Sequence, residues 1–338
     1  MIELKTPRGL PVKVPETLAE DPSPRFAWDE REGITKYYQE NGYVIVRALL
    51  DGAACDRIRQ LWDSEIKPSS AYIYRQATAK AERHKLNDKG WIMNPILNLQ
   101  SVDPVRYPNF RRFAVDNVLT DGHLCDAFRA LMGGEAPKIV QSMYFEGNSA
   151  TWEHQDSYYL DSAKIGSMAG AWIAVEDISA RAGRFFICPK SHLIDLGRQD
   201  AANNIADNHE VYIQQVVAQI RERGLTIRAP VLNKGDVLFW NAWTIHGSLD
   251  SQDPDQARSS ITCHAIPDSH DFLQLQSRIL PLDLKSINGI RIHHPKDLSR
   301  LSNRAVFALE TRFPGVFYGA KKMLLRAMIG ARSKRAQA

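Results

Sequence analysis

Residues 234–248 read KGDVLFWNAWTIHGS and hold the pattern on which the predicted fold depends. A Gly235-Asp236 turn precedes the apolar run Val237–Trp240, which is typical of a buried strand, and a second short run follows at 243–248. Runs of this kind, bounded by turn residues, recur through the second half of the chain at 138–146, 151–160, 168–176, 183–188, 228–232, 236–240, 243–248 and 258–266. Many short strands separated by Gly and Asp turns predict a sandwich or barrel.

Helices are expected around this β-rich half. The pattern predicts a short helix at 33–40, a buried strand at 42–47, a helix from Asp51 to Ile66, and a largely helical stretch from 104 to 132. The first 30 residues are rich in proline and predict an irregular, extended lead-in. One more helix interrupts the strands, with Asn208 as its expected N-cap and Gly224 at its end. Its apolar stripe is formed by Ile213, Val216, Val217 and Ile220.

Composition excludes several classes of protein. The 338 residues carry a net charge of +4 and are 44% hydrophobic, which is ordinary for a globular chain. No run of about 18 apolar residues predicts a membrane-spanning helix. The four cysteines are widely spaced and form no Cys-x-x-Cys pair, and the N-terminus has no signal-peptide pattern. We expect a cytoplasmic protein that binds no nucleic acid, since no basic stripe interleaved with aromatic residues runs through the body of the chain.

A candidate metal site begins at Trp152-Glu153-His154-Gln155-Asp156. In a strand, His154 and Asp156 point to the same side, so an imidazole and a carboxylate converge. This pair alone is weak evidence, because ten histidines often produce one beside an acid by chance. His246, which small residues follow, supplies the third candidate ligand. Two His and one carboxylate fill one face of an octahedron and leave three positions open, as in Fe(II) oxygenases.

Arg258 begins a run that alternates with period 2. Arg258, Ser260, Thr262 and His264 share one face of this predicted strand. A guanidinium with a hydroxyl two residues further on suits the binding of a carboxylate. A surface salt bridge with Asp250, Asp253 or Asp255 is an equally good interpretation of Arg258 on spacing alone.

The chain resembles the phytanoyl-CoA dioxygenase family of Fe(II)/2-oxoglutarate-dependent oxygenases over residues 34–270. The resemblance rests on the order and spacing of several motifs: 42–47 (GYVIVR), 141–145 (QSMYF), 152–159 (WEHQDSYY), 183–192 (GRFFICPKSH), 234–238 (KGDVL), 246–248 (HGS) and 258–260 (RSS). It implies a mainly β fold with flanking helices, built on a double-stranded β-helix (jelly-roll, cupin-like) core. The family's usual Pro-Gly-Ser-His turn is Pro189-Lys190-Ser191-His192 here, a change that we expect to matter little.

The resemblance also implies roles for single residues. His154, Asp156 and His246 are expected to be the catalytic iron ligands, and Arg258 is expected to anchor the distal carboxylate of 2-oxoglutarate. Ser260 is a helper to Arg258, and Gln141 lies near the co-substrate. The enzyme would use Fe(II), O₂ and 2-oxoglutarate, releasing succinate. Related halogenating enzymes lack the carboxylate ligand, so Asp156 favours hydroxylation or a related oxidation of a C–H bond.

We expect a single domain over 1–338 with two additions to the core. One is a helical insertion at about 193–230, and the other is the extension 271–338. From 319 to 338 the extension has six Lys/Arg and no acid, in a basic amphipathic helix that either contacts a membrane or packs on the core. Both additions would shape the substrate pocket, so the substrate, a small or carrier-linked molecule, is not identified.

Two competing functions are open to the sequence. The first is a jelly-roll metalloenzyme that does not use 2-oxoglutarate, against which Arg258 and Ser260 argue. The second is a non-catalytic jelly-roll protein that binds a ligand or a membrane, and the full set of metal ligands argues against it.

Overall fold

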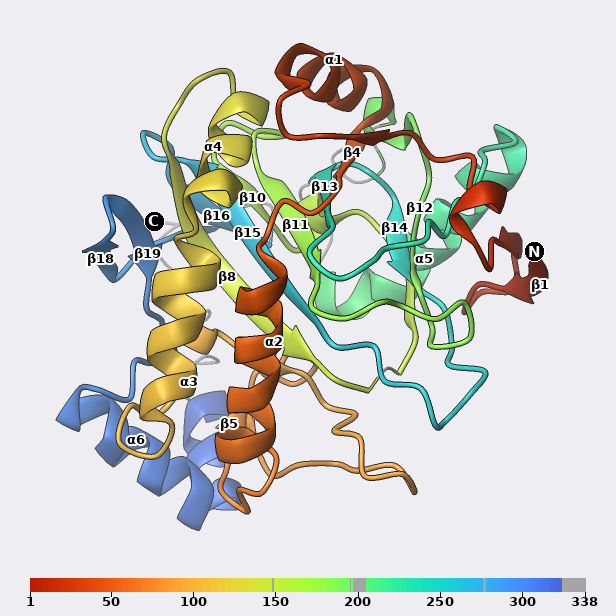
Figure 1. Cartoon of the computed structure of the whole chain (residues 1–338). Helices are drawn as coiled ribbons and strands as arrows, with labels where there is room; N and C mark the ends of the chain where they lie inside the picture. Colours follow the sequence, from red (N-terminus) through yellow and green to blue (C-terminus); the bar gives the residue numbers. More distant parts are fainter. Residues whose placement is uncertain (148, 195, 197–204, 276–277, 324–338) are drawn as a thin grey trace, which may run out of the picture.

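A computed structural model describes residues 1–147, 149–194, 196, 205–275 and 278–323, with side chains in 205–208 excepted. Its centre is a large sheet in which β8 (Pro137–Phe145), β15 (Ser260–Pro267), β11 (Ala169–Ala174), β13 (Val237–Asn241) and β4 (Tyr43–Val46) lie side by side, each antiparallel to the next (Figure 1). The sheet is extended at its edges by β3 (Arg25–Phe26), β7 (Ile96–Leu97), β18 (Leu284–Ile287) and β19 (Ile290–His293).

A smaller sheet packs against one face of the large one. It consists of β12 (Phe185–Ile187), β14 (His246–Ser248) and β9 (Thr151–His154), in that order. Leu238 and Trp240 of β13 and Trp172 of β11 form one buried cluster with Phe185 and Ile187 of β12. These two facing sheets form the predicted jelly roll, and the predicted fold class is confirmed.

Helices cover the opposite face of the large sheet. They are α1 (Arg31–Asn41), α2 (Gly52–Leu61), α3 (Pro108–Phe113) and α4 (Gly122–Leu131). The alternation predicted for the strands explains this layering, because Val237 and Phe239 point to the helices while their neighbours point to the small sheet. The rings of Phe128 on α4 and Phe239 on β13 pack edge to face with centroids 5.2 Å apart.

The remaining strands form three minor sheets. One contains β10 (Leu160–Ser162), β16 (Phe272–Gln274) and β17 (Arg278–Leu280). The second is a pair, β1 (Ile2–Lys5) with β2 (Pro11–Val14), where the sequence predicted only an irregular lead-in. The third pair is β5 (Ile73–Tyr74) with β6 (Ala81–Glu82).

Two predicted helical stretches are present but interrupted, and one predicted strand is not formed. The stretch 104–132 is largely helical as predicted, but a π-helical turn at Ala114–Leu119 ends its first half and Asp121 caps α4 by accepting from the Leu124 amide. Asp51 caps α2 as predicted, but α2 ends at Leu61 and the chain continues as a π-helical turn to Ile66. The strand at 228–232 is reduced to one isolated bridge between Arg228 and Ile187.

The inserted helix is α5 (Ile205–Glu222). Its predicted apolar stripe is buried with Tyr158 and Ile245, and Gly224 ends it at φ +60°. The expected N-cap at Asn208 is wrong, because the helix begins three residues earlier.

The C-terminal extension adds α6 (Leu301–Arg312) and a further helical stretch at 314–323. Most of the predicted basic helix at 319–338 lies outside the described residues. Among the residues that the structure describes, we find no helix with the length and hydropathy needed to traverse a bilayer. A cytoplasmic location stays a prediction.

Candidate active site

Two of the predicted metal ligands face each other across the small sheet. His154 is the last residue of β9 and His246 is the first residue of β14. They are register partners in this antiparallel pair, and their ring centroids lie 4.3 Å apart. Gly247 makes this approach of the strands possible, because a Cβ there would lie 2.6 Å from the Thr151 carbonyl oxygen.

Asp156 reaches the same point from a 3₁₀ turn at Asp156–Tyr158. The expected continuous strand over 151–160 is therefore wrong, although the turn also directs the carboxylate toward the two imidazoles. Its Oδ1 lies 3.7 Å from Nε2 of His154 and 3.6 Å from Nε2 of His246. The three ligand atoms all lie within 4.8 Å of one another.

Both imidazoles are oriented by the backbone. Nδ1 of His154 lies 2.8 Å from the Trp152 carbonyl, and Nδ1 of His246 lies 2.9 Å from the Thr244 carbonyl. Each Nδ1–H therefore donates to a carbonyl, which leaves the Nε2 lone pair facing the shared point. Burial lowers the pKa of His246 to about 4, so the ring is neutral at ordinary pH.

The second oxygen of Asp156 is held by two side chains. Nε1 of Trp240 donates to Oδ2 at 2.7 Å, and Nε2 of His264 lies 3.2 Å from the same atom. Burial opposes ionisation of Asp156, but the neighbouring His246 and His264 and its hydrogen bonds hold its pKa well below the usual range. Gly170 makes room for this arrangement, because a Cβ there would overlap the Trp240 indole.

This donor set fits ferrous iron. Two imidazole nitrogens and one carboxylate oxygen converge on one point, and the outward atoms of all three side chains are already hydrogen-bonded. From the sequence, His264 was predicted to share a strand face with Arg258, but no role was assigned to it. Trp240 was expected only to pack in the hydrophobic core. The period-2 alternation of the strands was the available signal, because Trp240 and His264 lie on strand faces that point toward the small sheet.

Arg258 lies just before β15 and is 2% exposed. Its Nη1 donates to the Gly183 carbonyl at 3.0 Å, while its Nε has no hydrogen-bond partner among the described residues. Burial lowers the pKa of Arg258 to about 9. The alternative salt bridge with Asp250, Asp253 or Asp255 is not found in the described part of the chain. A buried guanidinium without an acid is costly unless a ligand supplies one.

The two other candidates for binding the co-substrate, Gln141 and Ser260, differ in whether they line the cavity. Gln141 lines the same cavity as Arg258 and pairs in register with His264. Ser260 is fully buried, and its hydroxyl donates to the Arg258 carbonyl at 3.2 Å. Thr262, the next residue on that face, lines the cavity instead, and its Oγ1 has no partner among the described residues. The role of Ser260 stays a prediction.

One cavity of about 1330 Å³ is lined by the three candidate ligands and by Arg258, Thr262 and Gln141, but not by Ser260. Its inner end holds His154, Asp156, His246 and Arg258. Apolar side chains also line the cavity, among them Met93, Leu97, Met143, Leu160 and Phe272. Its outer end is lined by basic residues and by the C-terminal extension: Arg83, Lys85, Arg106, Lys296, Phe307 and Thr311.

The basic stretch 75–90 takes part in this outer wall. Its polar and basic sequence is typical of a solvated loop or an exposed helix, and it would also suit a flap over an anionic substrate. Arg83 and Lys85 are exposed yet line the cavity, whereas Arg75 is fully buried. Arg75 donates to the Asn94 carbonyl at 2.9 Å and lies 2.8 Å from Nδ1 of His84, so it holds the segment together.

The inserted helix α5 contributes a polar group that sequence reasoning missed. His209 lies on α5 and lines the cavity, with its Nε2 2.7 Å from the hydroxyl of Tyr159. The Tyr159 ring packs edge to face against His154, with centroids 5.8 Å apart. Burial raises the pKa of Tyr159 to about 12. The insertion thus places a Tyr–His pair beside one of the candidate iron ligands.

Comparisons with known proteins agree with this architecture. The model of a family described as phytanoyl-CoA dioxygenase (PhyH) matches residues 38–258. The chain is 23% identical to phytanoyl-CoA dioxygenase domain-containing protein 1 of Bos taurus over 263 residues, covering 67% of this chain and 87% of that protein. It is 23% identical to the peroxisomal phytanoyl-CoA dioxygenase of Homo sapiens, over 70% of this chain and 68% of that protein.

Solved structures share the fold at low sequence identity. The carbocyclase SnoK from nogalamycin biosynthesis, described as non-heme and alpha-ketoglutarate-dependent, has a TM-score of 0.52 at 16% identity, covering 75% of this chain and 90% of that one. EctD from S. alaskensis in its apo form has a TM-score of 0.51 at 16% identity, covering 86% of this chain and 94% of that one.

Proposed function

This chain belongs to the phytanoyl-CoA dioxygenase family of Fe(II)/2-oxoglutarate-dependent oxygenases, and we propose that it hydroxylates a C–H bond of a small or carrier-linked molecule. His154, Asp156 and His246 hold the iron, and Arg258 binds the distal carboxylate of 2-oxoglutarate. The single observation that carries this proposal is the convergence of the three ligand atoms within 4.8 Å, in a cavity also lined by Arg258, which is buried with no acidic partner among the described residues.

Bound iron supplies the oxidation, in which O₂ and 2-oxoglutarate are consumed and succinate, CO₂ and a hydroxylated product are released. The side chains of this protein position the reactants. Backbone carbonyls orient both imidazoles, and Trp240 with His264 orients the carboxylate, so the three ligand atoms are already directed toward one point.

Arg258 and Thr262 form the binding site for the co-substrate in this proposal. The Nε–H of the guanidinium and the hydroxyl of Thr262 are both buried donors that have no acceptor in the described part of the chain. A carboxylate that accepts from them would provide the missing counter-charge and remove the cost of two unsatisfied groups. Thr262 is better placed than Ser260 for this role because its side chain lines the cavity.

Hydroxylation is preferred to halogenation because of Asp156. A halogenating relative leaves the position of this carboxylate free for chloride, whereas here the carboxylate is present and held from two sides. The size of the cavity supports a substrate that is considerably larger than 2-oxoglutarate, since typical ligand pockets measure roughly 300–1,000 Å³. Its apolar lining residues and the exposed bases Arg83, Lys85, Arg106 and Lys296 favour a molecule with an apolar body and an anionic group.

The decisive experiment measures succinate formed from 2-oxoglutarate by the purified protein with and without Fe(II). Slow turnover without a substrate is expected, and it should require both iron and O₂. Absence of succinate from iron-loaded protein, together with no binding of 2-oxoglutarate by calorimetry, would refute the proposal. Mass spectrometry of candidate substrates then distinguishes addition of oxygen from addition of chlorine.

A further inference from the structure

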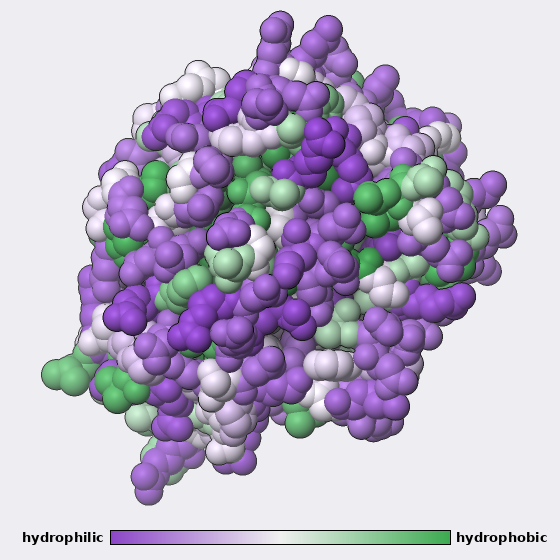
Figure 2. Space-filling view, viewed as in Figure 1, coloured by the Kyte–Doolittle hydropathy of each residue, from purple (hydrophilic) through white to green (hydrophobic). Residues whose placement is uncertain are grey.

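Helix α6 turns an apolar face to solvent. Of its twelve residues, Leu301–Arg312, only Glu310 is buried. The exposed apolar side chains along this helix and the stretch that follows are Leu301 (80%), Val306 (48%), Leu309 (48%), Phe313 (51%), Val316 (71%) and Met323 (67%). A surface helix normally turns its apolar stripe inward, so such a contiguous exposed face marks an interaction site. Figure 2 shows hydrophobic residues gathered at the lower left edge, where Figure 1 places α6.

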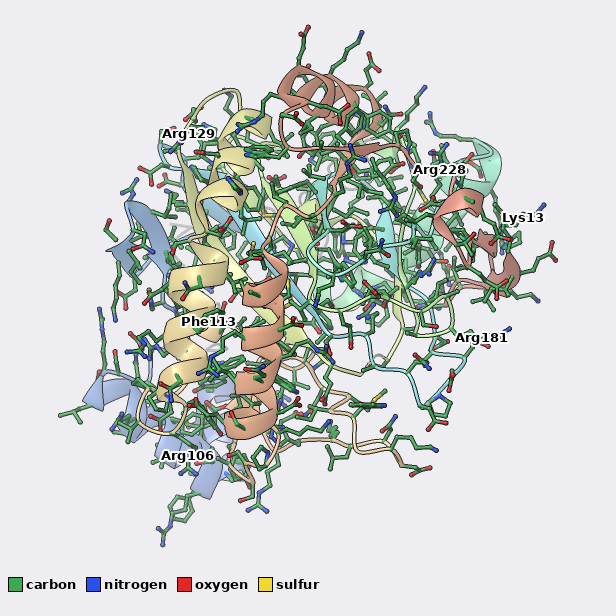
Figure 3. The ribbon with its side chains drawn as sticks, in the orientation of Figure 1. Lys13, Arg106, Phe113, Arg129, Arg181 and Arg228 are labelled. Atoms are coloured by element: carbon green, nitrogen blue, oxygen red, sulfur yellow. The ribbon has the colours of Figure 1, made fainter. Side chains whose placement is uncertain are left out.

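Basic residues surround this apolar face. Residues 296–323 contain six bases, namely Lys296, Arg300, Arg304, Arg312, Lys321 and Lys322. The only acids in this stretch of sequence are Asp297 and Glu310, and both are buried. Arg300 and Arg304 form ion pairs with Asp283 and Asp103 outside the stretch, which leaves Lys296, Arg312, Lys321 and Lys322 without an acidic ion-pair partner among the described residues. Arg106, which lines the same end of the cavity, is labelled at the lower left in Figure 3, at the end of the molecule where α6 lies. The face therefore combines exposed apolar groups with positive charge.

The opposite side of α6 is fixed to the body. Glu310 accepts hydrogen bonds from the Tyr74 hydroxyl at 3.0 Å, the Ala81 amide at 3.0 Å and the Tyr318 hydroxyl at 2.5 Å. Phe307 and Thr311 of the same helix line the outer end of the cavity. One helix thus forms a wall of the cavity on one side and the exposed apolar face on the other.

We propose that this face, termed the α6 surface and comprising Leu301, Val306, Leu309, Phe313, Val316 and the four bases Lys296, Arg312, Lys321 and Lys322, docks on an anionic lipid bilayer. Apolar side chains enter the interface between headgroups and acyl chains, while the bases bind anionic headgroups. A second copy of the chain is a poorer partner, because pairing two such faces would bring like charges together. The sequence after Met323 adds four bases and no acid, which extends the same charge. This proposal does not depend on the proposed reaction.

The test is co-sedimentation of the full-length protein with vesicles. Vesicles of phosphatidylcholine are compared with vesicles in which about a third of the lipid is phosphatidylglycerol. We expect binding to the anionic vesicles alone, weakened at high salt because the headgroup attraction is screened. Binding that is equal on both vesicles, or absent from both, would overturn the proposal.

Variants locate the contact. Val306→Asp/Phe313→Asp places two charges in the apolar face and should lower the partition coefficient about tenfold or more, since each charge near the surface counts for about 1 kcal/mol. Leu18→Asp, at a similarly exposed position (49%) in the N-terminal segment, is the matched control and should bind as the unchanged protein does.

Lys321→Glu/Lys322→Glu should weaken binding to anionic vesicles, while Lys5→Glu/Lys13→Glu, with the same change in charge, should not. If the α6 variants bind as tightly as their controls, the α6 surface is not the contact. A concentration-dependent dimer that Val306→Asp/Phe313→Asp disrupts, without vesicle binding, would assign the face to a second copy instead. Iron-dependent succinate formation in vesicle-free buffer should be unchanged in all of these variants, so failure of the proposed function would appear separately.

Discussion

The two ends of the cavity are built on different principles. The inner end lies on sheet strands and the turn that follows β9, and the outward atoms of its three candidate ligands are fixed by carbonyls, Trp240 and His264. The outer end is formed by loop segments between 70 and 107 and by α6, with exposed bases along its wall. The chemistry is thus placed on the rigid part of the fold, and selection of the substrate is left to elements that vary more easily.

At the inner end of the cavity, some buried polar atoms have hydrogen-bond partners and others have none among the described residues. The three candidate ligands are hydrogen-bonded on every side except the one facing their common point, whereas Arg258, Thr262 and His264 each keep a buried polar atom without a described partner. Polar atoms left unpaired at such a cost mark the places where a ligand is expected.

The largest effect should come from Asp156→Ala. Loss of a ligand should lower iron affinity and 2-oxoglutarate turnover by about a thousandfold, more than the ten- to hundredfold typical of outer-shell partners. Metal binding is measured by calorimetry, and turnover by succinate release. Asp250→Ala, an exposed acid near Arg258 in sequence, is the control. Iron binding that survives in Asp156→Ala would remove this residue from the ligand set.

Arg258→Met should raise the KM for 2-oxoglutarate by about a hundredfold, since a buried charge pair would be lost. It should not lower the melting temperature of the ligand-free protein, because the variant removes a buried charge that has no acidic partner. In the unchanged protein, 2-oxoglutarate should raise the melting temperature, and this shift should vanish in the variant. A variant that keeps its affinity for 2-oxoglutarate would show that the carboxylate binds elsewhere.

Trp240→Phe tests the outer support of the carboxylate. Removal of the indole N–H leaves Asp156 held by His264 alone, so iron affinity should fall about tenfold, with a smaller change in the KM for 2-oxoglutarate. Trp91→Phe is the matched control, because its indole nitrogen has no described partner. Equal iron affinities in the two variants would mean that Trp240 contributes to core packing but that its hydrogen bond to Asp156 does not support iron binding.

Asp297→Asn should have the smallest effect on turnover and should act on stability near the outer end. Burial opposes ionisation, but hydrogen bonds from Lys285 and Ser299 and the charge of Arg111 hold the pKa of Asp297 far below its usual value. The ionised carboxylate of Asp297 therefore stabilises the folded protein above the unfolded-state pKa of about 4, and this stabilisation is lost as pH falls below that value. Urea unfolding should give Asp297→Asn a free energy of unfolding about 2 kcal/mol lower than that of the unchanged protein at pH 7. This difference should become smaller below pH 5. A deficit independent of pH would contradict this account.

The sequence was informative where local patterns determine the structure. Alternation along 258–265 predicted the shared face of Arg258 and His264. The His154-x-Asp156 pair together with His246, in the motif order of the family, predicted the three side chains that meet. The sequence did not predict features that depend on contacts between segments far apart in the chain. Asp156 reaches the site from a turn rather than a strand, and the bond from Trp240 to its carboxylate joins residues 84 positions apart. The contribution of α6 to the cavity depends on Glu310 contacting Tyr74, a separation of 236 residues.

Because His154 and His246 are register partners, binding of a metal ion to both can report whether β9 and β14 are correctly aligned. A slip of one residue between β9 and β14 would turn one imidazole to the opposite face of the small sheet. Any ion that binds only when both nitrogens are present therefore favours the native alignment of two segments that are 92 positions apart in the chain. Metal affinity of this protein is then also an assay of correct assembly, usable on variants whose substitutions lie far from the site.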